Sequence, residues 1–136
     1  MKMTVTVSLV FISLLTVSCN RKKTINDELK EAATSMNKLM PQVLNEGIRL
    51  DSVSAEKDKV FKYNYTLTDD VKENVTPEAI DLFKKTTKSG ALDVVKTSDD
   101  MKDFRDNGVT MKYVYYDKNG KLMTDFTITK SEYGNK

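Results

Sequence analysis

Cys19 is the residue whose type and position most clearly suggest chemistry. It is the only cysteine in the chain, and it lies where an uncharged stretch over residues 3–18 gives way to the basic residues Arg21, Lys22 and Lys23. A lone thiol at the end of such a leader can be interpreted as an attachment point for lipid. A thiol that carries lipid can no longer act as a nucleophile or as a metal ligand.

The remaining composition gives little support for catalysis. The chain has no histidine, and histidine is the commonest general base and metal ligand near neutral pH. With the thiol committed to lipid, Cys–His catalysis and zinc sites built from nitrogen and sulfur are both excluded. Asp117, Asn119 and Gly120 resemble part of a calcium loop, but the full spacing of acidic ligands and the closing glutamate are missing. We therefore expect a turn there, no metal site and no cofactor.

Two pairs of acids leave one enzymatic alternative open. Asp69/Asp70 and Asp99/Asp100 lie beside expected helix starts, where acids complement the helix dipole. The same pairs could serve as catalytic carboxylates, as in a glycosidase. We expect a protein that is not an enzyme, with a carboxylate-based cell-wall hydrolase as the alternative.

The segment before Cys19 has the three parts of an export signal. Lys2 supplies the positive end, residues 5–15 supply an apolar core, and Ser18 supplies a small residue beside the cleavage site. The uncharged run is also long enough to compete as a membrane-spanning helix. Polar residues dilute it, however, and the stronger positive charge follows it, which for an uncleaved anchor would keep the C-terminal part in the cytoplasm.

The segment Leu15-Thr16-Val17-Ser18-Cys19 resembles the lipobox of bacterial lipoproteins. It departs from the usual pattern at Thr16, where leucine is commonest. The resemblance implies that the thiol receives a diacylglyceryl group, that the leader is cut before Cys19, and that the new amino terminus is acylated. Several acyl chains on one residue anchor a protein stably. The mature part otherwise resembles only small uncharacterised lipoproteins.

These inferences divide the chain into four parts. Residues 1–18 are the signal peptide, 19–26 the lipidated cysteine and a polar tether, 27–130 a single α+β domain, and 131–136 a frayed tail. The expected location is the cell envelope, outside the cytoplasm, with the protein held in the bilayer through acylated Cys19. In an organism with two membranes it faces the periplasm, and Asn20 weakly favours transport onward to the outer membrane.

Charge and size limit the partners. The chain carries 22 basic and 20 acidic residues, a net charge of +2, and this balance argues against nucleic acid, which requires a basic face. The length suits one domain that folds by burial alone, without an internal disulfide.

The N-terminal half of the domain predicts one helix and two strands. Thr24 and Asp27 resemble a capping box for a helix over residues 27–40, which Pro41 ends. Apolar alternation predicts strands over residues 48–53 and 59–68.

The C-terminal half predicts helices followed by a hairpin. Thr76-Pro77-Glu78 opens a second helix, which either ends at Gly90 or continues through Val95. A short helix follows over residues 99–107. The last two strands span residues 109–117 and 122–129 and flank a tight turn.

The order of these elements predicts an α+β fold. It consists of an N-terminal helix and an antiparallel sheet of about four strands in two hairpins. One or two helices lie between the hairpins, and all helices pack on one face. The sequence Lys-Tyr-x-Tyr occurs at Lys62 and again at Lys112, which we interpret as shared strand chemistry rather than a repeat.

A candidate binding patch lies on the face of the sheet that the helices leave open. Apolar side chains there stand among charged ones, a composition typical of contact surfaces. Isolated apolar residues are also normal on protein surfaces. The predicted function is a non-enzymatic module that binds an envelope protein or an incoming one, of the inhibitor, immunity or accessory type. The predicted patch consists of Val114, Tyr116, Met123, Lys112 and Asp125.

Overall fold

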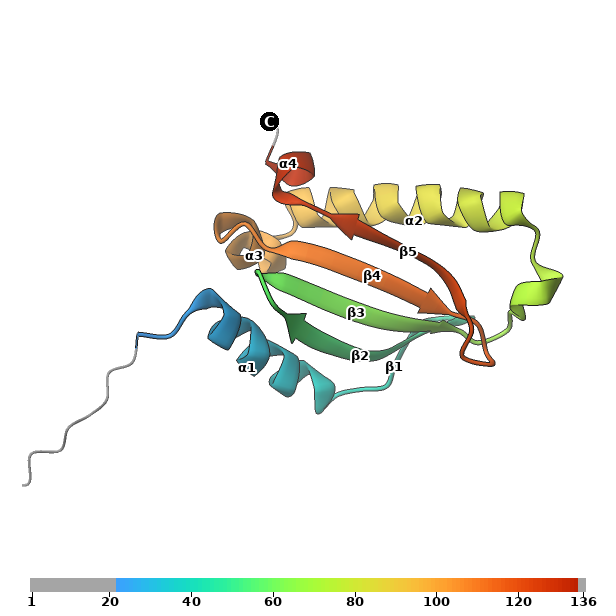
Figure 1. Cartoon of the computed structure of the whole chain (residues 1–136), viewed down its shortest axis with the longest axis horizontal. Helices are drawn as coiled ribbons and strands as arrows, with labels where there is room; N and C mark the ends of the chain where they lie inside the picture. Colours follow the sequence, from blue (N-terminus) through green and yellow to red (C-terminus); the bar gives the residue numbers. More distant parts are fainter. Residues whose placement is uncertain (1–21, 135–136) are drawn as a thin grey trace, which may run out of the picture.

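The computed structural model describes residues 22–134; Cys19, the leader and the last two residues lie outside them. Five strands, four α-helices and two 3-10 turns make up this part of the chain (Figure 1). In chain order they are α1 (Ile25–Asn37), β1 (Gln42–Asn45), β2 (Ile48–Glu56), β3 (Val60–Leu67), η1 (Lys72–Asn74), α2 (Pro77–Thr97), η2 (Asp99–Met101), α3 (Lys102–Asp106), β4 (Thr110–Tyr116), β5 (Leu122–Ile128) and α4 (Lys130–Tyr133).

The strands form one mixed sheet in the order β1-β2-β3-β4-β5. The α+β class, the N-terminal helix and a helix between strands agree with the sequence prediction. The prediction of about four antiparallel strands is wrong in two respects: β1 is a fifth strand, and β3 pairs with β4 in parallel. Parallel neighbours need a long crossover, usually through a helix, and α2 supplies it here.

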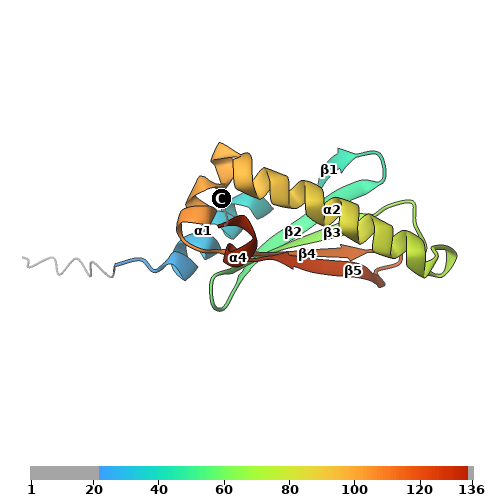
Figure 2. The ribbon, with the colours of Figure 1, turned by 90° about the horizontal axis from the view of Figure 1, so that it is seen from above.

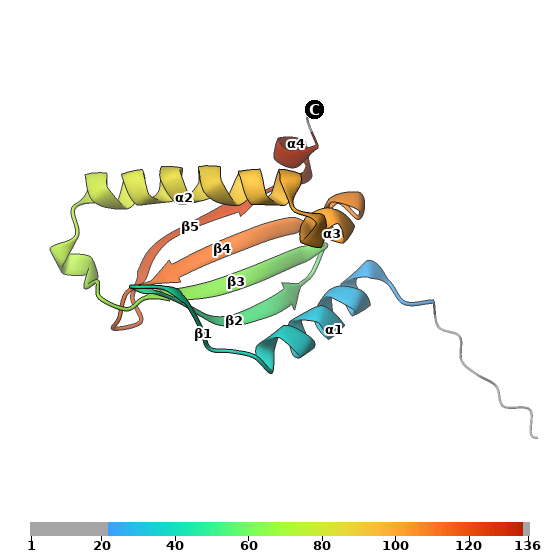
Figure 3. The ribbon, with the colours of Figure 1, turned by 180° about the vertical axis from the view of Figure 1, so that it is seen from behind.

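The helices cover one face of the sheet (Figures 2 and 3). α1 packs against β2, and α2 packs against β5. Leu29 of α1 and Val95 of α2 belong to the same buried cluster as Phe61 of β3. A single core therefore lies between the sheet and its helices, and the outer face of the sheet carries the polar side chains of the strands.

Two polar contacts fix α1 at its ends. At the start, the Thr24 hydroxyl accepts the amide hydrogen of Asp27, and the Asp27 carboxylate accepts that of Thr24, as the capping box predicts. The helix ends at Asn37, three residues before the predicted end. The Asn37 side-chain amide bonds both the N–H and the C=O of Val53, at 2.8 Å each. This contact attaches the end of α1 to the middle of β2.

α2 continues past Gly90 to Thr97, which settles the alternative that the sequence left open. Thr76 caps its first turn by accepting the amide hydrogen of Ala79. Along its 21 residues only Val95 is buried. Ile80, Phe83, Ala91 and Leu92 are half-buried and pack against the core, so α2 contacts the core through one face of the helix.

The predicted frayed tail is corrected for residues 131–134. Lys130–Tyr133 form α4, with Thr129 and Glu132 as its capping box. Tyr133 is buried, and its hydroxyl donates a hydrogen bond to the carbonyl oxygen of Val109. An aromatic side chain in the core thus holds this end of the described chain in place.

Candidate functional site

The structure brings four residues of the predicted patch together on the outer face of the sheet. Lys112, Val114 and Tyr116 alternate along β4, and Val114 lies opposite Asp125 of β5. Val114 is only 4% exposed, because neighbouring strands flank β4 on both sides. The exposed part of the predicted patch is therefore polar rather than apolar.

Met123 lies on the opposite face from the rest of the predicted patch. The register between β4 and β5 shifts between Tyr115 and Tyr116, which inserts one extra residue into β5. Such a bulge reverses the side to which a following side chain points. Met123 is buried beneath α2, where it lines a cavity of about 70 Å³ with Ile80 and Phe83.

The two acid pairs lie at opposite ends of α2. Asp70 precedes η1 before the helix starts, and Asp99 and Asp100 open η2 after it ends. A helix of 21 residues is about 30 Å long, so one pair cannot act with the other across a substrate. Within residues 22–134 no three acidic side chains are close enough to hold a metal ion.

Asp117 shapes the turn between β4 and β5, as predicted. Its carboxylate accepts the amide hydrogens of Lys72, Asn119 and Lys121, at 2.8–2.9 Å. These bonds, chiefly the one from Lys72, lower the pKa of Asp117, and burial opposes them. Because Lys72 begins η1, the turn also fixes the segment that leads into α2.

Four tyrosines form the centre of the inner face of the sheet. Parallel pairing places Tyr63 beside Tyr113 and Tyr65 beside Tyr115. The two pairs of rings stack, with centroids 5.0 and 4.7 Å apart and interplanar angles of 12° and 9°. In each pair, the face of one ring packs against the face of the other. The ring edges and the hydroxyl groups are therefore the parts of these side chains that are available for contacts above the sheet.

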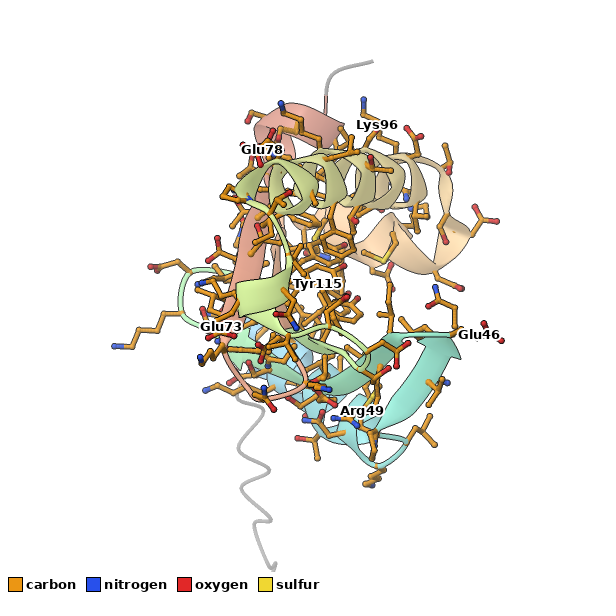
Figure 4. The ribbon with its side chains drawn as sticks, turned by 90° about the vertical axis from the view of Figure 1, so that its right-hand side faces the viewer. Glu46, Arg49, Glu73, Glu78, Lys96 and Tyr115 are labelled. Atoms are coloured by element: carbon orange, nitrogen blue, oxygen red, sulfur yellow. The ribbon has the colours of Figure 1, made fainter. Side chains whose placement is uncertain are left out.

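These tyrosines form the floor of an open, apolar groove of about 610 Å³. Figure 4 shows Tyr115 between the ribbons of α2 and of the β1–β2 hairpin. One wall consists of residues of α2, and the other of residues around the β1–β2 turn. Met101 of η2 also lines the groove, and none of the lining side chains carries a charge. The lining residues are Leu44, Asn45, Ile48, Tyr63, Tyr65, Thr87, Gly90, Ala91, Val94, Met101, Tyr113 and Tyr115.

The tyrosine hydroxyls are neutral and accessible from the groove. None of the four hydroxyl groups forms a hydrogen bond within residues 22–134. Since every fully buried side-chain oxygen in this part of the chain has a hydrogen-bond partner, these four hydroxyl groups are in contact with solvent, and their residues line the groove. Burial of the rings raises the pKa of Tyr113 to about 12 and also raises those of Tyr63, Tyr65 and Tyr115. Near neutral pH the floor thus offers uncharged donors and acceptors between apolar walls.

Polar contacts hold the segments at both ends of α2. At the N-terminal end, Asp117 holds η1 against the β4–β5 turn. At the C-terminal end, the Arg105 guanidinium donates hydrogen bonds to the carbonyl oxygens of Val95 and Ser98, at 2.7 and 2.6 Å. Between these contacts Gly90 and Val94 stay exposed.

The groove is the site that the sequence prediction missed. The second Lys-Tyr-x-Tyr segment aligns with the first residue by residue, Lys62 beside Lys112 and Tyr65 beside Tyr115. This repeated pattern was the available signal for the floor. The small residues of α2 gave a weaker signal, since Gly90 could also have ended the helix.

A family model described as a domain of unknown function, DUF8479, matches residues 23–124. No curated protein sequence matches the chain. Within the described residues, no helix combines the length and the apolar character needed to cross a bilayer.

Three solved structures share the fold at low sequence identity. One is the Pseudomonas aeruginosa protein PA3611, which is described as a secreted protein. It is 13% identical to this chain with a TM-score of 0.65, and the match covers 79% of this chain and 91% of PA3611. The pilotin EpsS of the Vibrio vulnificus type 2 secretion system is 12% identical with a TM-score of 0.63, over 82% and 94%. The type II secretion system pilotin AspS of Vibrio cholerae is 15% identical with a TM-score of 0.59, over 79% and 91%. At these identities the likeness is one of fold.

Proposed function

The chain belongs to the DUF8479 family, and we propose that this member is a membrane-anchored accessory protein of the cell envelope. It binds a segment of a partner protein in the groove between α2 and the β1–β2 hairpin, and it catalyses no reaction.

The uncharged groove is the observation that carries this proposal. It is apolar, open to solvent, and floored by neutral hydroxyls, with no carboxylate, lysine or arginine among its lining residues. A glycosidase needs two carboxyl groups that converge on the bond to be cleaved, and the groove contains none. Apolar walls with a few polar groups are typical of a site that binds without reacting.

The shared fold supports an accessory role in the envelope. Two of the structures that share it are pilotins of type II secretion systems. The likeness to pilotins does not favour an inhibitor or an immunity protein. Of the three types expected from the sequence, we therefore propose the accessory type. The partner in this proposal is a protein of the envelope, whose exposed segment enters the groove.

The anchoring part of the proposal rests on Cys19 and on the short segment after it. Helix α1 begins at Ile25, so few residues separate the domain from the proposed acyl chains. Extended chain spans at most about 3.5 Å per residue, which keeps the domain within roughly 20 Å of the bilayer.

Cys19→Ala tests the anchor. We expect the variant to lose metabolic labelling with fatty acid and to accumulate as a precursor that keeps its leader. Cys19→Ser, which nearly keeps the size of the side chain but also lacks the thiol, should give the same result. Unchanged processing and membrane retention in both variants would contradict lipidation.

Site-specific photo-crosslinking tests the groove. A photoreactive residue at Val94, which lines the groove, should give an adduct with one envelope protein in the native host. The matched control is Asp93, the preceding residue of α2, which is exposed and does not line the groove. The same adducts from both positions, or none from Val94, would contradict the groove as the binding site.

A further inference from the structure

We propose that the partner segment binds as an extended strand, which adds to the free edge of β1 and inserts alternate side chains into the groove. This inference rests on the proposed function, because it specifies the form and chemistry of the segment that the groove receives.

The edge at β1 is open along its whole length. β1 is the first strand of the sheet and pairs only with β2. All four of its residues are exposed, including Val43 at 73% and Leu44 at 50%. β1 carries no charged residue, and charge is the usual protection of a sheet edge against another strand. The opposite edge, β5, carries Asp125 and packs against α2.

The position of the groove relative to this edge explains which side chains of an added strand would be buried. Leu44 of β1 lines the groove, and α2 forms the opposite wall. Side chains alternate between the two faces of a strand. Every second side chain of a strand beside β1 therefore points, like Leu44, toward Gly90 and Val94 of α2.

Charged residues flank β1 in sequence and indicate the charges that the segment would carry at its ends. Lys38, the C-cap of α1, stands four positions before the first residue of β1, and Glu46 follows the strand directly. Both are exposed, and neither forms an ion pair within residues 22–134. The lining between them is uncharged. The complementary segment has apolar residues at alternate positions, an acidic residue beside Lys38 and a basic residue beside Glu46.

The extent of the edge limits the segment to a short one. Pro41, which has no amide hydrogen, precedes β1, and the pairing with β2 shifts register between Val43 and Asn45. Main-chain pairing is thus available over at most four residues, about 13 Å of extended chain.

The test uses a displayed library of random peptides, selected on the full lipid-anchored protein in detergent micelles. Groove binders are those whose affinity falls at least about tenfold on Val94→Asp, with Asp93→Asn as the matched control. Each binder is then synthesised with a single N-methyl group at each position in turn. A main-chain hydrogen bond lost in this way should weaken binding by about tenfold.

A strand and a helix give different results in this scan. In a strand, only alternate amides face β1, so N-methylation should weaken binding at every second position and be tolerated between. The bound peptide should also slow hydrogen exchange at those amides of Gln42–Asn45 that point away from β2. These two results together would support the inference.

Three results would overturn it. Binders with apolar residues at helical spacing that leave β1 exchange unchanged would refute the strand and leave the proposed function standing. Failure to find any binder sensitive to Val94→Asp would contradict the proposed function itself. Concentration-dependent protection of β1 amides without peptide would identify a second copy of the chain as the occupant of the edge.

Discussion

At the scale of single residues, Asp117 connects the β4–β5 turn to the start of α2. Its two carboxylate oxygens accept three amide hydrogens, two from its own turn and one from Lys72. A fully buried carboxylate is tolerated here because these bonds satisfy it. The same side chain therefore closes a local turn and positions one end of a groove wall.

Asp117→Asn should lower the free energy of unfolding near neutral pH, because one carboxylate oxygen becomes an NH2 group that faces an amide hydrogen. The folded state lowers the pKa of Asp117 from its ordinary 3.8. The stabilisation by the carboxylate is thus present above pH 3.8 and is lost as the pH falls through the folded-state pKa. Urea unfolding at several pH values should show the two proteins converging in acid.

Asp125→Asn is the matched control for this prediction. Asp125 is exposed on β5, so the same change should alter stability by less than about 0.5 kcal/mol. A stability difference for Asp117→Asn that stays constant down to strongly acidic pH would contradict the role of its charge.

At the scale of elements, α2 combines fixed ends with an exposed middle. Gly90 lies in this middle, and a Cβ built there meets no atom within 4 Å. Glycine in a helix costs about 0.5–1 kcal/mol relative to alanine. The absence of a side chain at Gly90 keeps the groove wide, at some cost to the stability of the helix.

Gly90→Ala should therefore raise the free energy of unfolding by about 0.5–1 kcal/mol, as measured by urea denaturation. Gly47→Ala, the contrasting control, should lower it by about 1 kcal/mol, because Gly47 has a φ of +89° and its Cβ would lie 3.3 Å from an Asp69 carboxylate oxygen. A loss of stability in Gly90→Ala would indicate that α2 packs more closely than the structure shows.

At the scale of the whole molecule, the parallel pairing of β3 with β4 creates both the core and the site. It joins two hairpins that are far apart in sequence and stacks the four tyrosines between them. Tyr113 also stacks on Phe126 of β5, at 4.9 Å. The groove floor is thus the upper surface of the hydrophobic core, so binding and folding depend on the same side chains.

This arrangement predicts that the protein loses stability in alkali. Burial raises the pKa of Tyr113 from 10.0 to about 12, so its contribution is fully present below pH 10 and is lost as the pH rises from 10 toward 12. Between pH 10 and pH 12 the free energy of unfolding should fall more steeply in the wild-type protein than in Tyr113→Phe, by about 1.4 kcal/mol per pH unit. Unfolding in urea across this range measures both slopes; parallel curves would contradict the prediction.

The sequence predicted the local features well because their causes are local. The capping box at Thr24 and Asp27 and the alternation in β3, with Phe61 and Tyr65 inward, depend on neighbours a few residues away. β1 was missed because four residues, Gln-Val-Leu-Asn, are too short for a period to be visible. The inward orientation of the Met123 side chain was missed because a β-bulge shifts the alternation of inward and outward side chains in β5, and no sequence pattern marks the bulge.

The sequence by itself determined the α+β class, the N-terminal helix and most of the strands, because hydrophobic period and capping are set by short-range geometry. It also supplied the expectation of a lipid anchor at Cys19, which the described residues do not include. Only the tertiary structure decided that β3 and β4 are neighbours, since pairing between distant strands depends on how α2 crosses between them. The same crossing places residues of α2 above the tyrosines of β3 and β4, where they line the uncharged groove.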